Sequence, residues 1–187
     1  MTDLFTALVA DWGVPALALI TFISCLALPV PASLAMLSAG AFVASGDLPI
    51  LPTVAAAFAG AVAGDRVGYG AGRWLGPQLS NGRKTGDLDA EVRRRGIPLV
   101  FYSRWLVSPL GPYVNVAAGA IRFNPGKFLI GVIGGEAVWV TLYVGLGAAF
   151  TSRIGALADL MGNLTGFLAA LAVMAASAFW LRRTREH

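Results

Sequence analysis

The chain has 187 residues, of which 57% are hydrophobic and only 13% are charged, whereas ordinary soluble domains are about 25% charged. A globule of this size cannot bury so much apolar surface, so we expect part of that surface to face lipid. This composition excludes a soluble enzyme. The net charge of +4 comes from bases in loops between apolar runs. Anionic lipid head groups, and not nucleic acid, are the partners we expect there.

The cysteine and histidine content argues against metal and redox chemistry. Cys25 is the single cysteine and His187, at the last position, is the single histidine. One cysteine excludes an intramolecular disulfide and a multi-cysteine zinc or iron–sulfur site, and this histidine is badly placed for a catalytic pair. Asp87, Asp89 and Glu91 come nearest to an acidic metal cluster, but they lie in a polar linker. We therefore expect no metal, no cofactor and no enzymatic activity.

The first apolar stretch, residues 13–46, carries no ionised side chain but is interrupted by Leu28-Pro29-Val30-Pro31. Each proline removes a backbone donor and disfavours helix in the residue before it, which predicts a helical hairpin pivoting at these prolines. A run over 53–74 follows and, at ~1.5 Å per residue, covers the roughly 30 Å hydrocarbon core. Residues 13–75 are thus predicted to be a first unit of hairpin plus span.

A second unit of the same kind is predicted over residues 97–150. The polar segment 76–96 comes first and is interpreted as a water-exposed linker with one short helix. The next apolar stretch breaks at Ser108-Pro109-Leu110-Gly111-Pro112 and is followed by a run over 128–150 that is long enough to span. Residues 159–181 form one further predicted span at the C-terminal end.

Basic residues set the predicted topology, because Lys and Arg collect in cytoplasmic loops. They place the linker, the Arg122–Lys127 corner and the C-terminal arginines in the cytoplasm, so residues 97–121 must enter the membrane and return. The first hairpin then enters from the opposite face. Broken backbone at membrane depth is tolerated only when it is buried in protein or lines a wet cavity. We expect an all-α polytopic protein of the cell (inner) membrane, with two re-entrant helical hairpins, three membrane-spanning helices and a cytoplasmic C-terminus.

Short similar segments recur in the two units. One pair is Ala39-Gly40-Ala41-Phe42 and Ala118-Gly119-Ala120-Ile121, and the other is Ala63-Gly64-Asp65-Arg66-Val67 and Gly134-Gly135-Glu136-Ala137-Val138. Because the units would have opposite orientation, this indicates an inverted repeat of the kind that transporters build around a midplane site.

Four ionisable residues inside the apolar segments are functional candidates: Asp65, Arg66, Arg104 and Glu136. An ionisable residue at mid-span costs about 2.5–3.5 kcal/mol and is a functional candidate by default. One interpretation is a substrate-binding cluster in which Arg104 receives an anionic group such as phosphate, which its planar guanidinium suits. The residues leave open the structural alternative, in which the carboxylates only neutralise the arginines and hold the hairpins against the bundle.

Several motifs in this order carry a family resemblance. They are the Leu28–Pro31 break, Gly64-Asp65-x2-Gly68-Tyr69-x2-Gly72-Arg73-x2-Gly76, Phe101-x-Ser103-Arg104-Trp105 before Ala118-Gly119, and Trp139 in the following span. Over residues 13–181 the chain resembles the DedA family (SNARE-associated Golgi protein or VTT domain). The resemblance implies a membrane protein with two re-entrant elements that moves phospholipid or lipid-linked phosphate, such as undecaprenyl phosphate, between leaflets by flipping or scrambling.

The chain departs from the family pattern at two places. Ser24 and Ser33 stand near the first pivot, where family members often carry acidic residues, and Leu110-Gly111-Pro112 replaces a usual second arginine. The resemblance therefore carries over to Arg104 and Asp65 alone, while Glu136 is our own addition. Proton coupling stays open, as does homo-oligomerisation. The alternatives to a lipid transporter are a membrane-embedded enzyme of lipid metabolism and a non-transporting scaffold.

Overall fold

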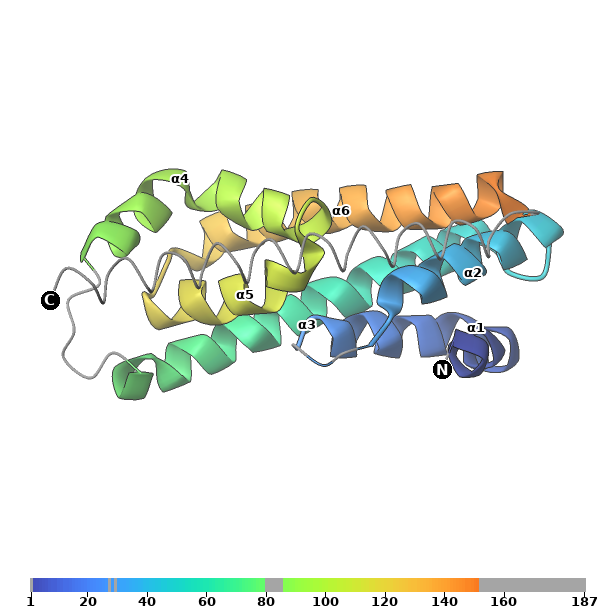
Figure 1. Ribbon diagram of the computed structural model, residues 1–187, viewed down its shortest axis with the longest axis horizontal. Helices are drawn as coiled ribbons and strands as arrows, with labels where there is room; N and C mark the ends of the chain where they lie inside the picture. The colour runs from blue at the N-terminus through green and yellow to red at the C-terminus, as the bar shows by residue number, and fades with distance from the viewer. Residues whose placement is uncertain (1, 27, 29, 80–85, 152–187) are drawn as a thin grey trace, which may run out of the picture.

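The computed structural model describes residues 2–26, 28, 30–79 and 86–151, so Pro29 and the predicted span 159–181 lie outside the described residues. Every regular element in the described part is helical (Figure 1). In chain order these elements are α1 (Thr2–Ser24), α2 (Ala32–Ser45), α3 (Ile50–Leu79), α4 (Gly86–Trp105), the short 3-10 helix η1 (Ser108–Leu110), α5 (Gly111–Ala120) and α6 (Pro125–Ala149).

The helices break at the two proline-rich segments. Helix α1 ends at Ser24 and α2 begins at Ala32, so the chain leaves helical geometry around the first pair of prolines. Helix α4 ends at Trp105, and the chain passes through η1 before α5 begins. Pro112 lies in the first turn of α5, where a missing backbone N–H costs no intrahelical hydrogen bond.

Among the described residues, two helices are long and apolar enough to cross a membrane. The spanning portions are Ile50–Gly76 of α3, with 27 residues, and Pro125–Ala149 of α6, with 25 residues. At ~1.5 Å per residue they measure about 40 and 37 Å, which exceeds the hydrocarbon core. They contain nearly all of the two runs predicted at 53–74 and 128–150. Asn124 fixes the start of α6 by accepting a 3.0 Å hydrogen bond from the backbone N–H of Lys127.

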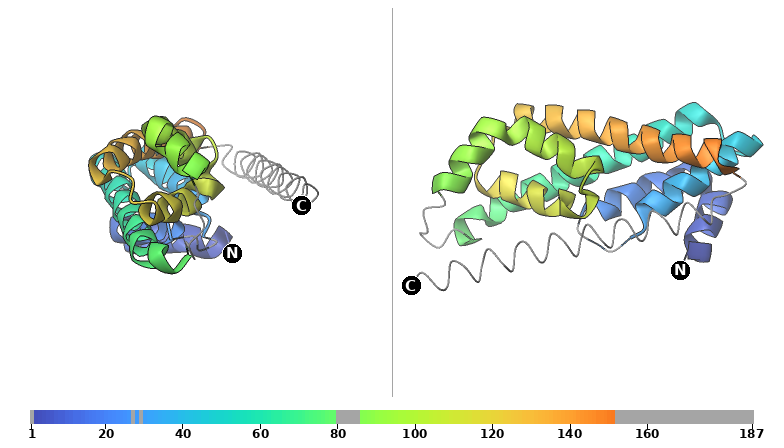
Figure 2. Two further views of the ribbon diagram at one scale, coloured as in Figure 1. Left: turned by 90° about the vertical axis from the view of Figure 1, so that its left-hand side faces the viewer. Right: turned by 45° about the horizontal axis from the view of Figure 1, so that its top comes forward.

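The two helical hairpins, α1–α2 and α4–α5, lie on the long helices in a crossed arrangement. Helices α1 and α5 both pack against α3, and helices α2 and α4 both pack against α6. The hairpins approach from opposite ends of the bundle and reverse direction near its middle (Figures 1 and 2). Each long helix therefore contacts the first arm of its own unit's hairpin and the second arm of the other's. Both helix breaks consequently lie near the centre of the molecule.

The crossed contacts depend on glycine at matching places. A Cβ atom at Gly40 of α2 would overlap the carbonyl oxygen of Val144 in α6. A Cβ atom at Gly119 of α5 would likewise overlap the carbonyl oxygen of Tyr69 in α3. Both glycines belong to the Ala-Gly pairs in which the sequence shows internal similarity, so these pairs make equivalent packing contacts.

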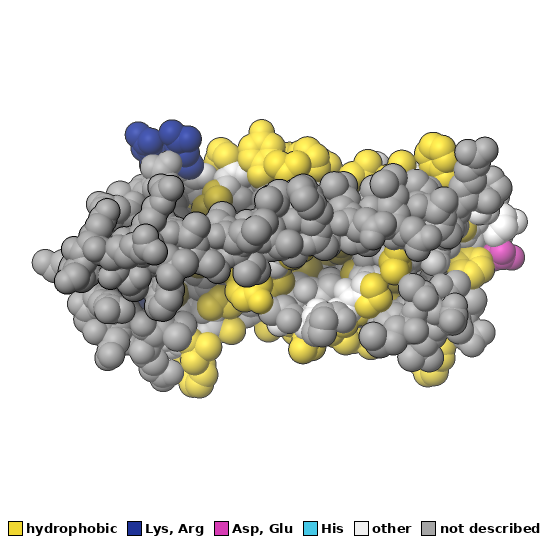
Figure 3. Space-filling model, viewed as in Figure 1, with side chains coloured by type: hydrophobic (Ala, Val, Ile, Leu, Met, Phe, Trp, Pro, Cys, Tyr) yellow, Lys and Arg dark blue, Asp and Glu magenta, His cyan; other side chains and the backbone are white. Residues whose placement is uncertain are grey.

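The bundle exposes large apolar side chains along its length. Trp12, Leu51, Trp74, Ile130 and Leu142 are all exposed. On the face shown in Figure 3, the hydrophobic side chains that are visible lie mostly between the two ends of the molecule, with basic side chains toward one end and an acidic one at the other. This distribution is typical of a protein whose middle faces lipid and whose ends face water.

Helix fills more of the predicted linker, 76–96, than a single short helix would. Helix α3 continues to Leu79, and α4 begins at Gly86. Helix α4 kinks at Arg95, where φ is −116° and ψ is 17°, three residues before Pro98. Arg94 and Arg95 at this kink are exposed, and the water-facing position of this segment stays a prediction.

Candidate functional site

A buried ion pair joins α3 to α4. Nη1 of Arg104 donates a hydrogen bond to Oδ1 of Asp65 at 2.8 Å. The exposed fraction is 0% for Asp65 and 4% for Arg104. Removal of one partner from such a buried pair is costly, because it leaves an uncompensated charge.

Asn115 of α5 completes the network. Its Nδ2 donates to Oδ1 of Asp65 at 2.7 Å, and its Oδ1 accepts from Nη2 of Arg104 at 2.6 Å. Asn115 is fully buried, so three helices are joined by three polar side chains that hydrogen-bond to one another. The sequence analysis missed Asn115. The available signal was a single amide within the otherwise apolar segment Val114–Ala118.

Glu136 of α6 and Cys25, just after α1, complete the cluster. Glu136 is 2% exposed and Cys25 is 7% exposed. The Sγ atom of Cys25, one carboxylate oxygen of Asp65 and one of Glu136 lie within 4.8 Å of one another. If both carboxyl groups are ionised, the single guanidinium of Arg104 balances only one of them. Sequence reasoning set Cys25 aside as a lone thiol.

Glycines beside the two acidic residues bring α1 and α4 close to the long helices. A Cβ atom at Gly64 would overlap the carbonyl oxygen of Phe22 and lie 2.9 Å from Cβ of Cys25. A Cβ atom at Gly135 would lie 2.7 Å from the carbonyl oxygen of Phe101 and 2.5 Å from Cγ of Arg104. Cys25 therefore packs closely against α3 at Gly64, and Arg104 packs in the equivalent way against α6 at Gly135. The missing side chains at these glycines allow both groups to reach the acidic residues.

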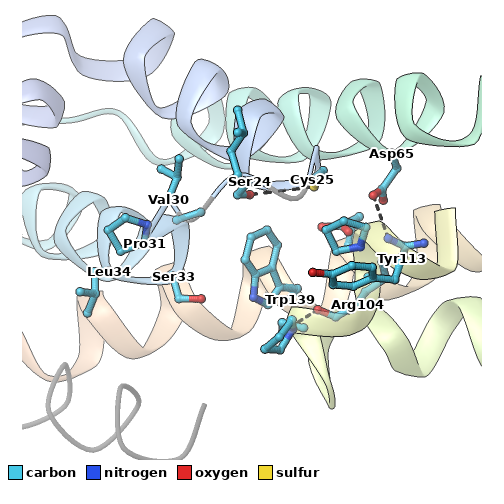
Figure 4. Close-up of a pocket in the computed structure, with 17 residues that line it drawn as sticks. Ser24, Cys25, Val30, Pro31, Ser33, Leu34, Asp65, Arg104, Tyr113 and Trp139 are labelled. Carbon is cyan, nitrogen blue, oxygen red and sulfur yellow. Dashed lines mark hydrogen bonds and ion pairs between the residues drawn. The ribbon is translucent and has the colours of Figure 1, made fainter. Parts of the chain in front are cut away.

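A cavity of about 500 Å³ opens beside the cluster, and both helix breaks contribute to its wall. Figure 4 shows the end of α1, the ring of Trp139 and the Asp65–Arg104 pair around it. Its lining residues combine the charged cluster with pivot and apolar residues, including Leu28, Val30, Pro31, Ser33, Pro109, Gly111, Pro112 and Tyr113. The cavity is therefore largely apolar with one polar side, which suits a molecule with an apolar body and a polar end.

Several buried polar atoms at the cluster have no hydrogen-bond partner within the described part of the chain. Oδ2 of Asp65 and Oε2 of Glu136 are unpaired acceptors, and Nε of Arg104 and Nε1 of Trp139 are unpaired donors. Buried polar groups normally have partners, so each exception calls for an explanation. Because all four residues line the cavity, a polar ligand entering it could satisfy both kinds of group.

Arg66 does not join the cluster, contrary to its sequence-based grouping with Asp65. Its side chain is exposed and lines a separate groove with Tyr69 and Pro125. Adjacent residues of an α-helix point about 100° apart, so a buried Asp65 turns its neighbour outward. Of the predicted pivots, Pro31, Pro109, Gly111 and Pro112 line the cavity, while Pro29 lies outside the described residues.

Comparison with known proteins gives the family. Residues 28–149 match the model of the VTT domain. The chain is also 34% identical over 149 residues to "Uncharacterized membrane protein slr0232" of Synechocystis sp., a match that covers 75% of this chain and 67% of the relative. No solved structure matches the chain. The family match includes part of the first hairpin break, the whole of the second, the buried network and all of α6. The chain therefore belongs to the VTT-domain (DedA) family of membrane proteins.

Proposed function

We propose that the protein translocates phospholipid or undecaprenyl phosphate between the leaflets of the cell (inner) membrane and performs no covalent chemistry on it. The observation that carries this proposal is the buried Asp65–Arg104–Asn115 network, which borders a cavity between two broken helical hairpins. Ionisable residues within membrane segments are costly to insert, and such residues commonly mark a substrate or ion pathway.

The proposed membrane arrangement follows from the crossed packing. In it, α3 and α6 span the bilayer, residues 159–181 provide a third span, and the C-terminus is cytoplasmic. The hairpins α1–α2 and α4–α5 are re-entrant and enter from opposite faces. Their approach from opposite ends of the bundle, together with the equivalent glycine contacts, supports an inverted repeat. Transporters with inverted repeats bind substrate near the midplane, at the interface of the repeats.

The unpaired donors suggest how a phosphate head group would bind. Nε of Arg104 and Nε1 of Trp139 are buried at the cavity without a partner within the described residues. A phosphate oxygen there would accept charge-assisted hydrogen bonds, which are roughly twice as strong as neutral ones. It would also compete with Asp65 for the guanidinium. The apolar part of the cavity wall would leave the acyl or prenyl chains in contact with hydrocarbon.

The test is transbilayer movement of a labelled phospholipid, and separately of a labelled polyprenyl phosphate, in proteoliposomes. Arg104→Ala is expected to abolish the protein-dependent movement of the transported lipid, because it removes the guanidinium that faces the cavity. Lys127→Ala removes an exposed charge far from the cavity and should leave movement unchanged. Size-exclusion chromatography must show that both variants remain folded.

If the Arg104→Ala variant moved lipid at the wild-type rate, Arg104 would have no part in the mechanism. Chemically altered lipid in the same vesicles would favour a membrane-embedded enzyme of lipid metabolism. If the wild-type protein moved neither lipid, a non-transporting scaffold would be favoured instead.

A further inference from the structure

The buried cluster contains a set of metal-ligating groups that extends beyond the Asp65–Arg104–Asn115 network on which the proposed translocation rests. A thiol and two carboxyl groups converge there from three separate segments. They are Cys25 at the end of α1, Asp65 of α3 and Glu136 of α6, with one ligand atom from each within 4.8 Å of the others. We propose that these three residues bind a divalent transition metal ion, with Zn²⁺ the best match, at the wall of the cavity.

Among the residues that the structure describes, the hydrogen bonds of Asp65 leave one carboxylate oxygen free, as is common for a carboxylate that binds a metal. Its Oδ1 accepts from Nη1 of Arg104 at 2.8 Å and from Nδ2 of Asn115 at 2.7 Å, whereas its Oδ2 has no partner within the described residues. Carboxylates that ligate metals are typically oriented by such outer hydrogen bonds. Arg104 and Asn115 thus hold one oxygen in place and leave the other available for a cation.

Glu136 adds a second, independent indication. Its exposed fraction is 2%, and Oε2 has no partner within the described part of the chain although it is buried. With Asp65 and Glu136 both ionised, one guanidinium leaves an excess negative charge in a region of low dielectric. Buried charges are normally paired or coordinate metals, so a bound cation would supply both the missing partner and the missing charge.

The ligand types select the metal. Thiolate and carboxylate together suit Zn²⁺, whereas Mg²⁺ and Ca²⁺ require six or more oxygen ligands. With Zn–S of about 2.3 Å and Zn–O of about 2.1 Å, tetrahedral geometry places the ligand atoms roughly 3.4–3.6 Å apart. Side-chain shifts of about 1 Å would bring the three atoms to these separations. The fourth position would face the cavity, since all three residues line it.

The single cysteine makes this proposal directly testable with Co²⁺ as a spectroscopic stand-in for Zn²⁺. In the full-length wild-type protein in detergent, Co²⁺ should produce a thiolate-to-cobalt charge-transfer band that saturates at one equivalent and is bleached by Zn²⁺. Cys25→Ser should remove that band. Glu136→Gln should weaken Co²⁺ binding by more than the roughly 10–100-fold that loss of an outer hydrogen-bond partner costs.

Two further variants separate ligands from their supports. Asn115→Ala removes an outer hydrogen bond to Asp65 and the acceptor of Arg104 Nη2 but no metal ligand, so it should weaken binding roughly 10–100-fold while the thiolate band persists. Asp47→Asn changes an exposed carboxylate at the far end of α2 and should change neither the band nor the affinity.

Absence of the band in folded wild-type protein at saturating Co²⁺ would overturn the proposal, and it is the result expected if the two carboxyl groups share a proton instead. Unchanged affinity in folded Glu136→Gln would also overturn it. If the variants do not fold, the wild-type protein alone decides the question. Zn²⁺ should slow alkylation of Cys25 by a small thiol reagent, and failure to protect the thiol would refute the site.

Discussion

Replacement of Arg104 by methionine tests the buried network most directly. Methionine keeps much of the apolar length of the side chain but removes the guanidinium that donates to Asp65 and Asn115. The carboxylate of Asp65, which is 0% exposed, then keeps only the amide of Asn115. Breaking a buried ion pair in this way costs about 3–5 kcal/mol of unfolding free energy. The companion change, Asp65→Asn, should also destabilise the protein, because it leaves Arg104 without its counter-charge.

The double variant Arg104→Met/Asp65→Asn contains neither charge of the pair. Its loss of unfolding free energy should be smaller than the sum of the single losses by about 1–3 kcal/mol. Reversible unfolding in mixed detergent micelles, followed by circular dichroism, measures all three values. Arg66→Met is the matched control, because Arg66 adjoins Asp65 in the chain but is exposed, and it should change stability by no more than about 0.5 kcal/mol. Additive losses, or a loss below about 1 kcal/mol for Arg104→Met, would refute this reasoning.

Two further predictions concern packing and topology. Gly72→Ala should destabilise the bundle by about 1–3 kcal/mol, since its Cβ would overlap the carbonyl oxygen of Val116 in α5. Gly70→Ala, two residues earlier, meets no atom within 4 Å and should stabilise α3 by up to about 1 kcal/mol; the same unfolding assay checks both, and equal shifts would contradict the contact. In a Cys25→Ser background, Asp47→Cys should react with an impermeant maleimide from outside the cell, and Lys127→Cys only from the cytoplasmic side. Reaction of both from one face would exclude opposed hairpins.

The helical elements followed closely from local properties of the sequence. Apolar run length predicted α3 and α6, and the prolines predicted where α1 and α4 would end. The linker was expected to contain one short helix, and its residues from Gly86 onward belong to α4, which continues past the linker to Trp105. A water-facing helix and a water-facing loop have similar polar composition. Hydropathy therefore distinguishes lipid-facing from water-facing segments better than it distinguishes helix from coil.

The membrane character of the chain and the identity of its unusual buried charges were decided by the sequence itself. Too few charges for a soluble globule, two proline breaks, and Asp65, Arg104 and Glu136 within apolar segments are all visible without coordinates, because insertion cost depends on residue type and depth alone. Which polar groups meet was decided only by the tertiary structure. Asn115 bridges the ion pair, Cys25 reaches the carboxylates, and Arg66 turns away. These outcomes depend on the rotation of each helix about its axis and on close approach at Gly64 and Gly135, which packing between distant segments determines.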